Sequence, residues 1–180
     1  MRKDPTSDKT YNKAIKLIET SLNIEIRKVD LFNISKQEFR DLISLKQPYL
    51  LNFVRGFYFS PNDTIYILEG NEDDLQTFIH ETLHSNSVFH YFNSPRWIRE
   101  GLTKAITDII LKNKGLSTEI DYYLQKEKEY WIKKLKTHQK LILKAYFSKN
   151  FAEGVNILKK ILKTEKNILE ITFNEYLKEI

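Results

Sequence analysis

The residues best suited to chemistry stand close together in the stretch FIHETLHSN, residues 78–86. His80 and His84 are four residues apart, a spacing that puts two side chains about 40° apart on one side of a helix. Two imidazoles so placed can bind one zinc ion, and Glu81 can reach a water molecule beside the metal without binding the ion itself. The pattern H-E-x-x-H therefore indicates either a hydrolytic zinc site or the solvated side of an ordinary amphipathic helix.

A catalytic zinc ion takes three protein ligands, so a third ligand must come from elsewhere in the chain. One candidate is His90, which gives H-E-x-x-H-x-x-S-x-x-H and nearly reproduces the metzincin pattern. However, Ser87 stands where that pattern has glycine, and Met1 is the only methionine, so the methionine turn of that family is missing. The better candidate is Glu100, within the segment SPRWIREGL at residues 94–102.

This segment resembles the glutamate helix of gluzincins, the thermolysin-like and aminopeptidase-N-like zinc peptidases. In that family a W-x-x-E-G sequence follows H-E-x-x-H after a short connection. Trp97, Glu100 and Gly101 match it here, with Glu100 sixteen residues after His84. The resemblance covers roughly residues 56–112, and the chain is similar in scale to the minigluzincins.

The resemblance implies a site with one Zn²⁺ per chain, bound by His80, His84 and Glu100. Zinc lowers the pKa of a bound water and polarises a peptide carbonyl, and Glu81 would take the water proton and pass it to the leaving amine. An oxyanion donor is expected from the helical half, and the sequence leaves five residues open for this role: Tyr122, Tyr123, Tyr130, His138 and Tyr146.

One residue departs from the thermolysin pattern. Lys104 stands four residues after Glu100, where thermolysin has an aspartate that orients a zinc histidine. Asp108 or a backbone carbonyl are the candidates to replace it. We therefore expect slow or narrow activity.

A peptide or protein substrate is expected to pair with a sheet edge above the cleft, supplied by either GFYF or TIYIL. The G-x-M-E-N signature of aminopeptidase N relatives cannot occur, because the only methionine is Met1. The sequence therefore favours an endopeptidase over an aminopeptidase. A zinc-binding domain that is latent, or that has no catalytic activity, is the first alternative.

Hydrophobic periodicity and turn residues predict the elements that position these groups. We expect a polar leader at residues 1–9, a helix capped by Ser35, a helix capped by Asn71 that carries the histidines, and a helix with Ser94 as N-cap and Pro95 as first residue. We also expect a helix at 11–22 and strands at 24–32, 50–59 and 64–70, of which the last two form a hairpin around SPND. Further helices are expected near 117–136, 138–147, 150–163 and 165–178.

The order of these elements predicts an α+β fold, and the resemblance to gluzincins implies that this fold is zincin-like. We expect one such domain over residues 1–180, with a small mixed or antiparallel sheet and the active-site helix in an upper subdomain at 10–90. A lower helical subdomain follows at 91–180, with Gly115 as a candidate hinge.

Composition limits the alternatives. The 180 residues contain no cysteine, which excludes thiolate ligands, and no apolar run long enough to span a bilayer, so we expect a cytoplasmic protein without membrane contact. Residues 126–163 contain eleven lysines and three glutamates. A basic module that binds nucleic acid, with Tyr130, Trp131 and Tyr146 stacking on bases, is therefore the second alternative, and the sequence does not favour it. The oligomeric state does not follow from the sequence.

Overall fold

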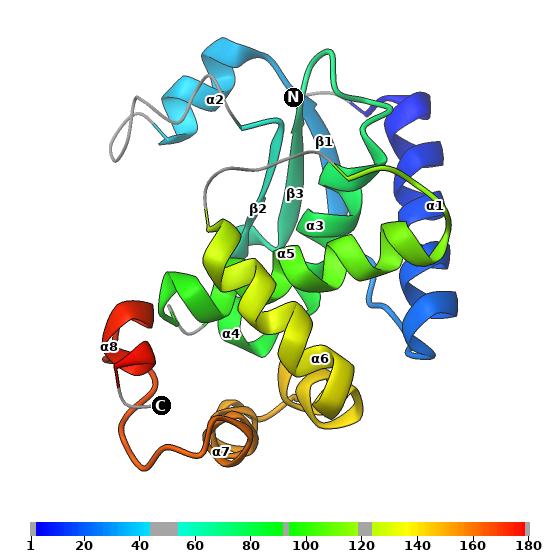
Figure 1. Cartoon of the computed structure of the whole chain (residues 1–180). Coiled ribbons are helices and arrows are strands. Elements are labelled where there is room, and N and C mark those ends of the chain that lie inside the picture. Colours follow the sequence, from blue (N-terminus) through cyan, green and yellow to red (C-terminus); the bar gives the residue numbers. More distant parts are fainter. Residues whose placement is uncertain (1–2, 44–53, 92–93, 119–123, 179–180) are drawn as a thin grey trace. The chain divides into compact units, whose positions relative to one another are not determined.

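The computed structural model describes residues 3–43, 54–91, 94–118 and 124–178. The chain divides into two compact units, residues 1–85 and 86–180. Within the described ranges the first unit combines helices with a small mixed sheet and the second is helical, which confirms the α+β class (Figure 1). None of the helices described is both long and apolar enough to cross a membrane.

The first unit is built on a three-stranded sheet with the order β1-β3-β2. Its elements are α1 Pro5–Leu22, β1 Asp30–Ile34, α2 Lys36–Ile43, β2 Gly56–Phe59, the 3₁₀ turn η2 Ser60–Asn62, β3 Thr64–Leu68 and α3 Leu75–Asn86. The central strand β3 is parallel to β1 and antiparallel to β2. The expected hairpin around SPND is therefore confirmed, and β2 is an edge of the sheet among the described strands.

Helices cover both faces of this sheet. Successive side chains of β3 point to opposite faces, and all five of its residues are buried. On one face Tyr66 packs in a buried cluster with Phe39 of α2. On the other face a Cβ added at Gly56 would lie 2.8 Å from the side chains of both Ile67 and Thr77. A glycine at this position therefore lets α3 lie close against β2.

The N-terminal helix is longer than its periodicity predicts. Asp4 caps α1 by accepting hydrogen bonds from the backbone N–H groups of Thr6 and Ser7 at 2.8 and 3.3 Å. Pro5 occupies the first turn, where the missing N–H costs nothing. The prediction of a polar leader is therefore wrong from Pro5 onward, because these capping signals outweigh the polarity of the segment.

Two predictions around the first strand have different outcomes. Ser35 caps α2 as expected: its hydroxyl accepts from Glu38 N at 3.2 Å, and the Glu38 carboxylate accepts from Ser35 N at 2.8 Å. The strand expected at 24–32 begins only at Asp30. The backbone N–H of Val29 instead donates to the Tyr11 hydroxyl at 3.0 Å, a contact made by α1.

The helix that carries the histidines begins at Leu75, four residues after its expected start. Asn71 instead forms a turn, in which its carbonyl accepts from Asp74 N at 3.2 Å. Asp74 takes over as the capping residue, because its carboxylate accepts from both the backbone N–H and the hydroxyl of Thr77, at 3.3 and 2.7 Å. The prediction that Asn71 caps this helix is therefore wrong.

Replacement of Asp74 by alanine is expected to destabilise the protein by about 1 kcal/mol, the usual cost of losing an N-cap. For a chain of this size that corresponds to a fall in Tm of roughly 2–4 °C, measurable by circular dichroism. Asp73→Ala is the matched control, because Asp73 is exposed. Equal Tm values for the two variants would contradict the capping role of Asp74.

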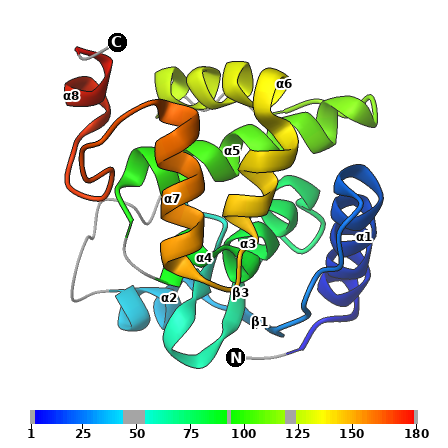
Figure 2. The same cartoon turned by 90° about the horizontal axis from the view of Figure 1, so that it is seen from below.

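The second unit contains only helices within its described residues. They are α4 Val88–Tyr91, α5 Arg96–Asn113, α6 Gln125–Tyr146, α7 Phe151–Leu162 and α8 Phe173–Leu177. Helix α6 packs against both α5 and α7 (Figure 2). The predicted break near residue 137 is a kink inside α6, where His138 has φ −131° and ψ 26°. Of the last predicted segment, only Phe173–Leu177 is helical, with Thr172 and Glu175 forming a capping box.

Two boundaries of α5 concern the candidate ligand helix. Ser94 does not cap it, because the helix begins at Arg96 after Pro95, whose carbonyl accepts from Ile98 N at 2.9 Å. At the other end Gly115 adopts a left-handed conformation with φ +67° and its N–H donates to the carbonyl of Lys112 at 3.0 Å. Gly115 thus terminates the helix, and its role as a hinge stays a prediction.

Candidate metal centre

The two histidines of the H-E-x-x-H sequence both lie on α3, and their side chains approach each other. Their Nε2 atoms are 2.9 Å apart, their ring centroids are 4.5 Å apart, and the ring planes are at 86°. Two nitrogen ligands of a tetrahedral zinc ion lie roughly 3.3 Å apart, given Zn–N distances of about 2.0–2.1 Å. Small rotations of the rings of His80 and His84 would therefore suit one ion, and the pair fits a metal.

The polar residues of this helix are not all solvated. His84 is 3% exposed, Glu81 is 8% exposed, and His80 is partly buried. A solvated helix face would leave such side chains in water, because burying them without partners costs free energy. The alternative interpretation, the solvated side of an amphipathic helix, is therefore wrong for Glu81 and His84.

Glu81 is held by the edge strand of the sheet. Its Oε2 atom accepts a hydrogen bond from the backbone N–H of Tyr58 at 2.8 Å. The contact follows from matched spacing: four helix residues from Thr77 to Glu81 rise about 6 Å, and two strand residues from Gly56 to Tyr58 rise about 6.6 Å. Since Gly56 admits Thr77 closely, Glu81 arrives opposite Tyr58 one turn later.

The sheet also decides between the two candidate substrate edges. TIYIL is the central strand β3, so it offers no edge to a substrate. GFYF is β2. Just before this strand, the carbonyl of Arg55 accepts a hydrogen bond from Leu68 N at 2.8 Å, so Arg55 points its backbone groups toward β3. Because antiparallel partners alternate, Gly56 and Tyr58 direct their backbone groups away from β3, as the contact of Tyr58 N with Glu81 bears out.

In the second unit, Glu100 lies in the first turns of α5, between two residues whose types are explained by packing. Trp97 stacks on Trp131, with ring centroids 5.6 Å apart and planes at 14°. A Cβ at Gly101 would lie 3.0 Å from the Cβ of Glu127, so glycine lets α6 approach α5. Glu100 itself is partly exposed and pairs with Arg99 at 3.2 Å. In W-x-x-E-G, packing therefore accounts for Trp and Gly but not for Glu.

Residues of the C-terminal segment also contact Trp97. The indole N–H donates to the backbone carbonyl of Ile171 at 3.0 Å, and the ring stacks on Tyr176 with centroids 5.4 Å apart. The carbonyl of Trp97 accepts from the indole N–H of Trp131 at 2.8 Å. The start of the helix that carries Glu100 is thus anchored on two sides by aromatic residues.

Asp108, the residue proposed to replace the missing aspartate, has other partners. The Asp108 carboxylate contacts Lys128 at 3.3 Å and Lys112 at 3.6 Å. Burial lowers the pKa of Lys104, and the nearby Glu100 carboxylate opposes this shift. An orienting role for Asp108 stays a prediction, and it would have to be shared with two lysines.

The candidate oxyanion donors differ in accessibility. The Tyr146 hydroxyl is buried and hydrogen-bonds Thr103 Oγ1 at 2.7 Å, while the Tyr130 hydroxyl hydrogen-bonds that of Tyr176 at 2.8 Å. His138 lies at the kink of α6, with Nδ1 2.7 Å from Thr137 Oγ1. Tyr122 and Tyr123 lie outside the described residues. The assignment of a donor stays open.

The remaining sequence hypotheses can be placed as well. His90 is part of the short helix α4. Trp131 and Tyr146 are both 0% exposed, so neither can stack on a nucleic acid base. Lys128 is also buried, in its ion pair with Asp108. Two of the three aromatic residues that the nucleic-acid hypothesis assigned to base stacking are therefore excluded from that role.

Sequence reasoning missed three residues around the candidate site: Arg27, Tyr58 and Asp63. Their contacts are distant in sequence or involve the backbone, so no local pattern could indicate them. Comparison of the chain with models of protein families, with curated proteins and with solved structures finds no match. Function is therefore inferred from the H-E-x-x-H motif and the geometry within each unit.

Proposed function

We propose that this chain is a zinc-dependent metallopeptidase of the gluzincin type, with a zincin-like fold. The observation that carries the proposal is the convergence of the His80 and His84 Nε2 atoms, 2.9 Å apart, on the same helix as Glu81. Two imidazoles alone are a common feature of helices. Their combination with a buried carboxylate between them is what a hydrolytic site requires.

The proposed ligands are His80, His84 and Glu100, each of which offers one ligand atom. Two imidazole nitrogens and one carboxylate oxygen form the donor set that thermolysin uses for its catalytic zinc. Bound zinc would supply a Lewis acid that polarises a peptide carbonyl and makes water more acidic. The assignment of Glu100 comes from the resemblance of W-x-x-E-G to the gluzincin motif.

Glu81 would move the protons. Its carboxylate would accept a proton from the attacking water and give it to the amine that leaves when the peptide bond breaks. The hydrogen bond from Tyr58 N fixes the direction of this carboxylate. A preset orientation matters, because a general base acts only within hydrogen-bonding distance of the proton it takes.

A peptide or protein segment is the proposed substrate. An extended peptide can add to the outer edge of β2 through the backbone groups of Gly56 and the carbonyl of Tyr58, which point away from β3, while the N–H of Tyr58 stays on Glu81. Backbone recognition of this kind requires no free terminus. It therefore agrees with an endopeptidase, as does the absence of the methionine-containing signature of aminopeptidase N relatives.

The first test is the metal content of protein purified without added metal, followed by hydrolysis of a mixture of unstructured peptides. We expect about one zinc per chain and internal cleavage that stops when a chelator removes the metal and returns when zinc is restored. Zinc without hydrolysis of any peptide would favour a latent or non-catalytic zinc domain. No zinc, even after incubation with excess metal, would contradict the proposal.

A further inference from the structure

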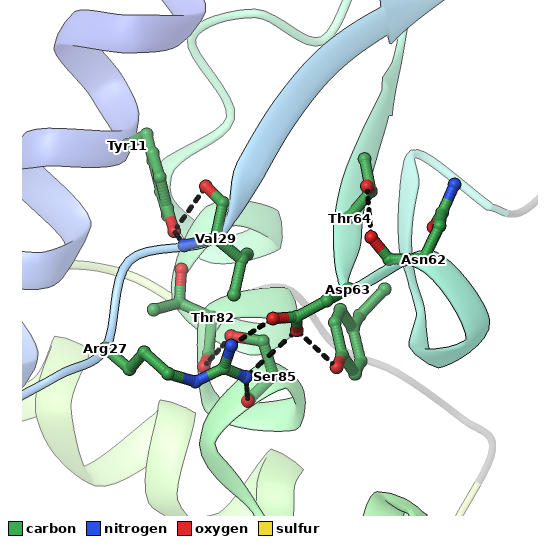
Figure 3. A network of polar contacts seen from close by, with 9 residues as sticks. Tyr11, Arg27, Val29, Asn62, Asp63, Thr64, Thr82 and Ser85 are labelled. Atoms are coloured by element: carbon green, nitrogen blue, oxygen red, sulfur yellow. Dashed lines mark hydrogen bonds and ion pairs between the residues drawn. The ribbon is translucent and has the colours of Figure 1, made fainter.

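Arg27 contacts two parts of the first unit that also carry residues of the candidate site or their partners. Its guanidinium donates to both carboxylate oxygens of Asp63, with Nη2 2.9 Å from Oδ1, and to the carbonyl of Ser85 at 2.8 Å (Figure 3). Asp63 lies in the turn between β2 and β3, and Ser85 lies in the last turn of α3. One side chain therefore contacts the hairpin and the helix that carries the histidines.

The contact with Ser85 acts directly beside a candidate ligand. The last carbonyl groups of a helix have no partner within the helix, and a positive charge at this end favours the helix dipole. Ser85 follows His84 immediately. Arg27 thus stabilises the turn that determines where the imidazole of His84 points.

The contact with Asp63 extends to the candidate general base. The hydroxyl of Tyr58 also donates to Asp63 Oδ1, at 2.7 Å. The backbone N–H of Tyr58 in turn holds Glu81 Oε2 at 2.8 Å. Arg27 therefore reaches Glu81 through two intervening residues, with each step made by a hydrogen bond or an ion pair.

Arg27 is itself fixed by its neighbours in the chain. Ile26 is buried, and its N–H donates to the Glu19 carboxylate at 3.2 Å. Val29 is held by the hydroxyl of Tyr11, whose pKa is raised by burial, so the phenol keeps its proton (Figure 3). Because the backbone is already held on both sides, ordering Arg27 in its contacts costs mainly side-chain entropy.

We propose that Arg27 is a positioning residue for the zinc site, which it serves by aligning His84 and Glu81. The inference rests on the proposed function. As a stability element the ion pair is minor, because the side chains of Arg27 and Asp63 are 47% and 42% exposed and ion pairs between exposed side chains contribute little to folding. Its effect on metal binding should therefore exceed its effect on folding.

The test measures zinc affinity by competition with a chelating dye, together with Tm and peptide hydrolysis. Arg27→Met is expected to raise the Kd for zinc about tenfold, the lower end of the effect of supporting residues around a metal site. We expect kcat to fall while KM stays unchanged, because Arg27 orients the reacting groups without contacting the substrate. Arg27→Lys should recover only part of the loss, since an ammonium group cannot form the two-pronged contact.

Arg55→Met is the matched control. The side chain of Arg55 is 43% exposed, close to the 47% of Arg27, and forms an ion pair with Asp74 at 3.0 Å, at the opposite end of α3 from His84. The inference holds if Arg27→Met loses zinc affinity and Arg55→Met does not. Equal zinc affinities for wild type and Arg27→Met, or equal losses in both variants, would overturn it and leave the proposed function intact. A wild-type chain that binds no zinc would overturn both.

Discussion

Glu81→Gln is expected to lower the rate of peptide hydrolysis about 10²–10⁴-fold while leaving zinc bound, because general acid–base catalysis typically contributes this factor. The amide of glutamine has nearly the volume of the carboxylate, and its oxygen can still accept the hydrogen bond from Tyr58 N. The glutamine amide, however, cannot take a proton from water at neutral pH. The loss should therefore appear in kcat, with zinc content and Tm close to those of wild type.

Glu25→Gln provides the control for the chemical change alone, because Glu25 is an exposed residue in the same unit. It should hydrolyse peptides at the wild-type rate. If Glu81→Gln also kept the wild-type rate while binding zinc, Glu81 would not be the general base. If Glu81→Gln lost zinc as well, its carboxylate would be needed for the metal site itself, and the assignment of roles within H-E-x-x-H would have to change.

His84→Ala is expected to remove zinc almost completely from protein purified without added metal. Two remaining protein ligands bind zinc far more weakly than three, and ligand geometry is part of the binding free energy. In wild type, zinc at one hundred times its Kd should raise the free energy of unfolding by about 2.7 kcal/mol. This increase should be absent in His84→Ala, which thermal unfolding with and without zinc can measure.

Two further variants identify the third ligand. Glu100→Gln should weaken zinc binding strongly, because an amide oxygen lacks the negative charge of the carboxylate. His90→Ala should keep about one zinc per chain under the same conditions, since His90 is not among the proposed ligands. The reverse pattern, with zinc lost on replacing His90 and kept on replacing Glu100, would favour the metzincin interpretation and contradict the gluzincin one.

The elements whose signals are local were largely predictable. The capping box of Ser35 and Glu38 lies within four residues, and it starts α2 where expected. The break before His138 was also indicated, although it is a kink rather than an end. The start of α3 was misplaced because two capping residues compete: Asn71 is favoured by its type, but Asp74 reaches two donors on Thr77.

Contacts between distant residues were not predictable. The hydrogen bond of Tyr58 to Glu81 spans 23 residues, and the contacts of Arg27 with Asp63 and Ser85 span 36 and 58. Such contacts depend on which strand lies at the edge and which helix packs beside it. Periodicity describes one element at a time, so it cannot specify these neighbours.

The sequence by itself determined the convergence of His80 and His84, because side chains four residues apart on a helix must lie on the same side. It also identified Glu100 as a proposed third ligand, through its resemblance to gluzincins. Only the tertiary structure decided that β2 is an edge strand, that its Tyr58 N–H holds Glu81, and that Arg27 links this strand to the end of α3. The contact of Tyr58 with Glu81 follows from the close approach of α3 to β2 at Gly56, and the other two features follow from the strand order and from contacts between residues far apart in the chain.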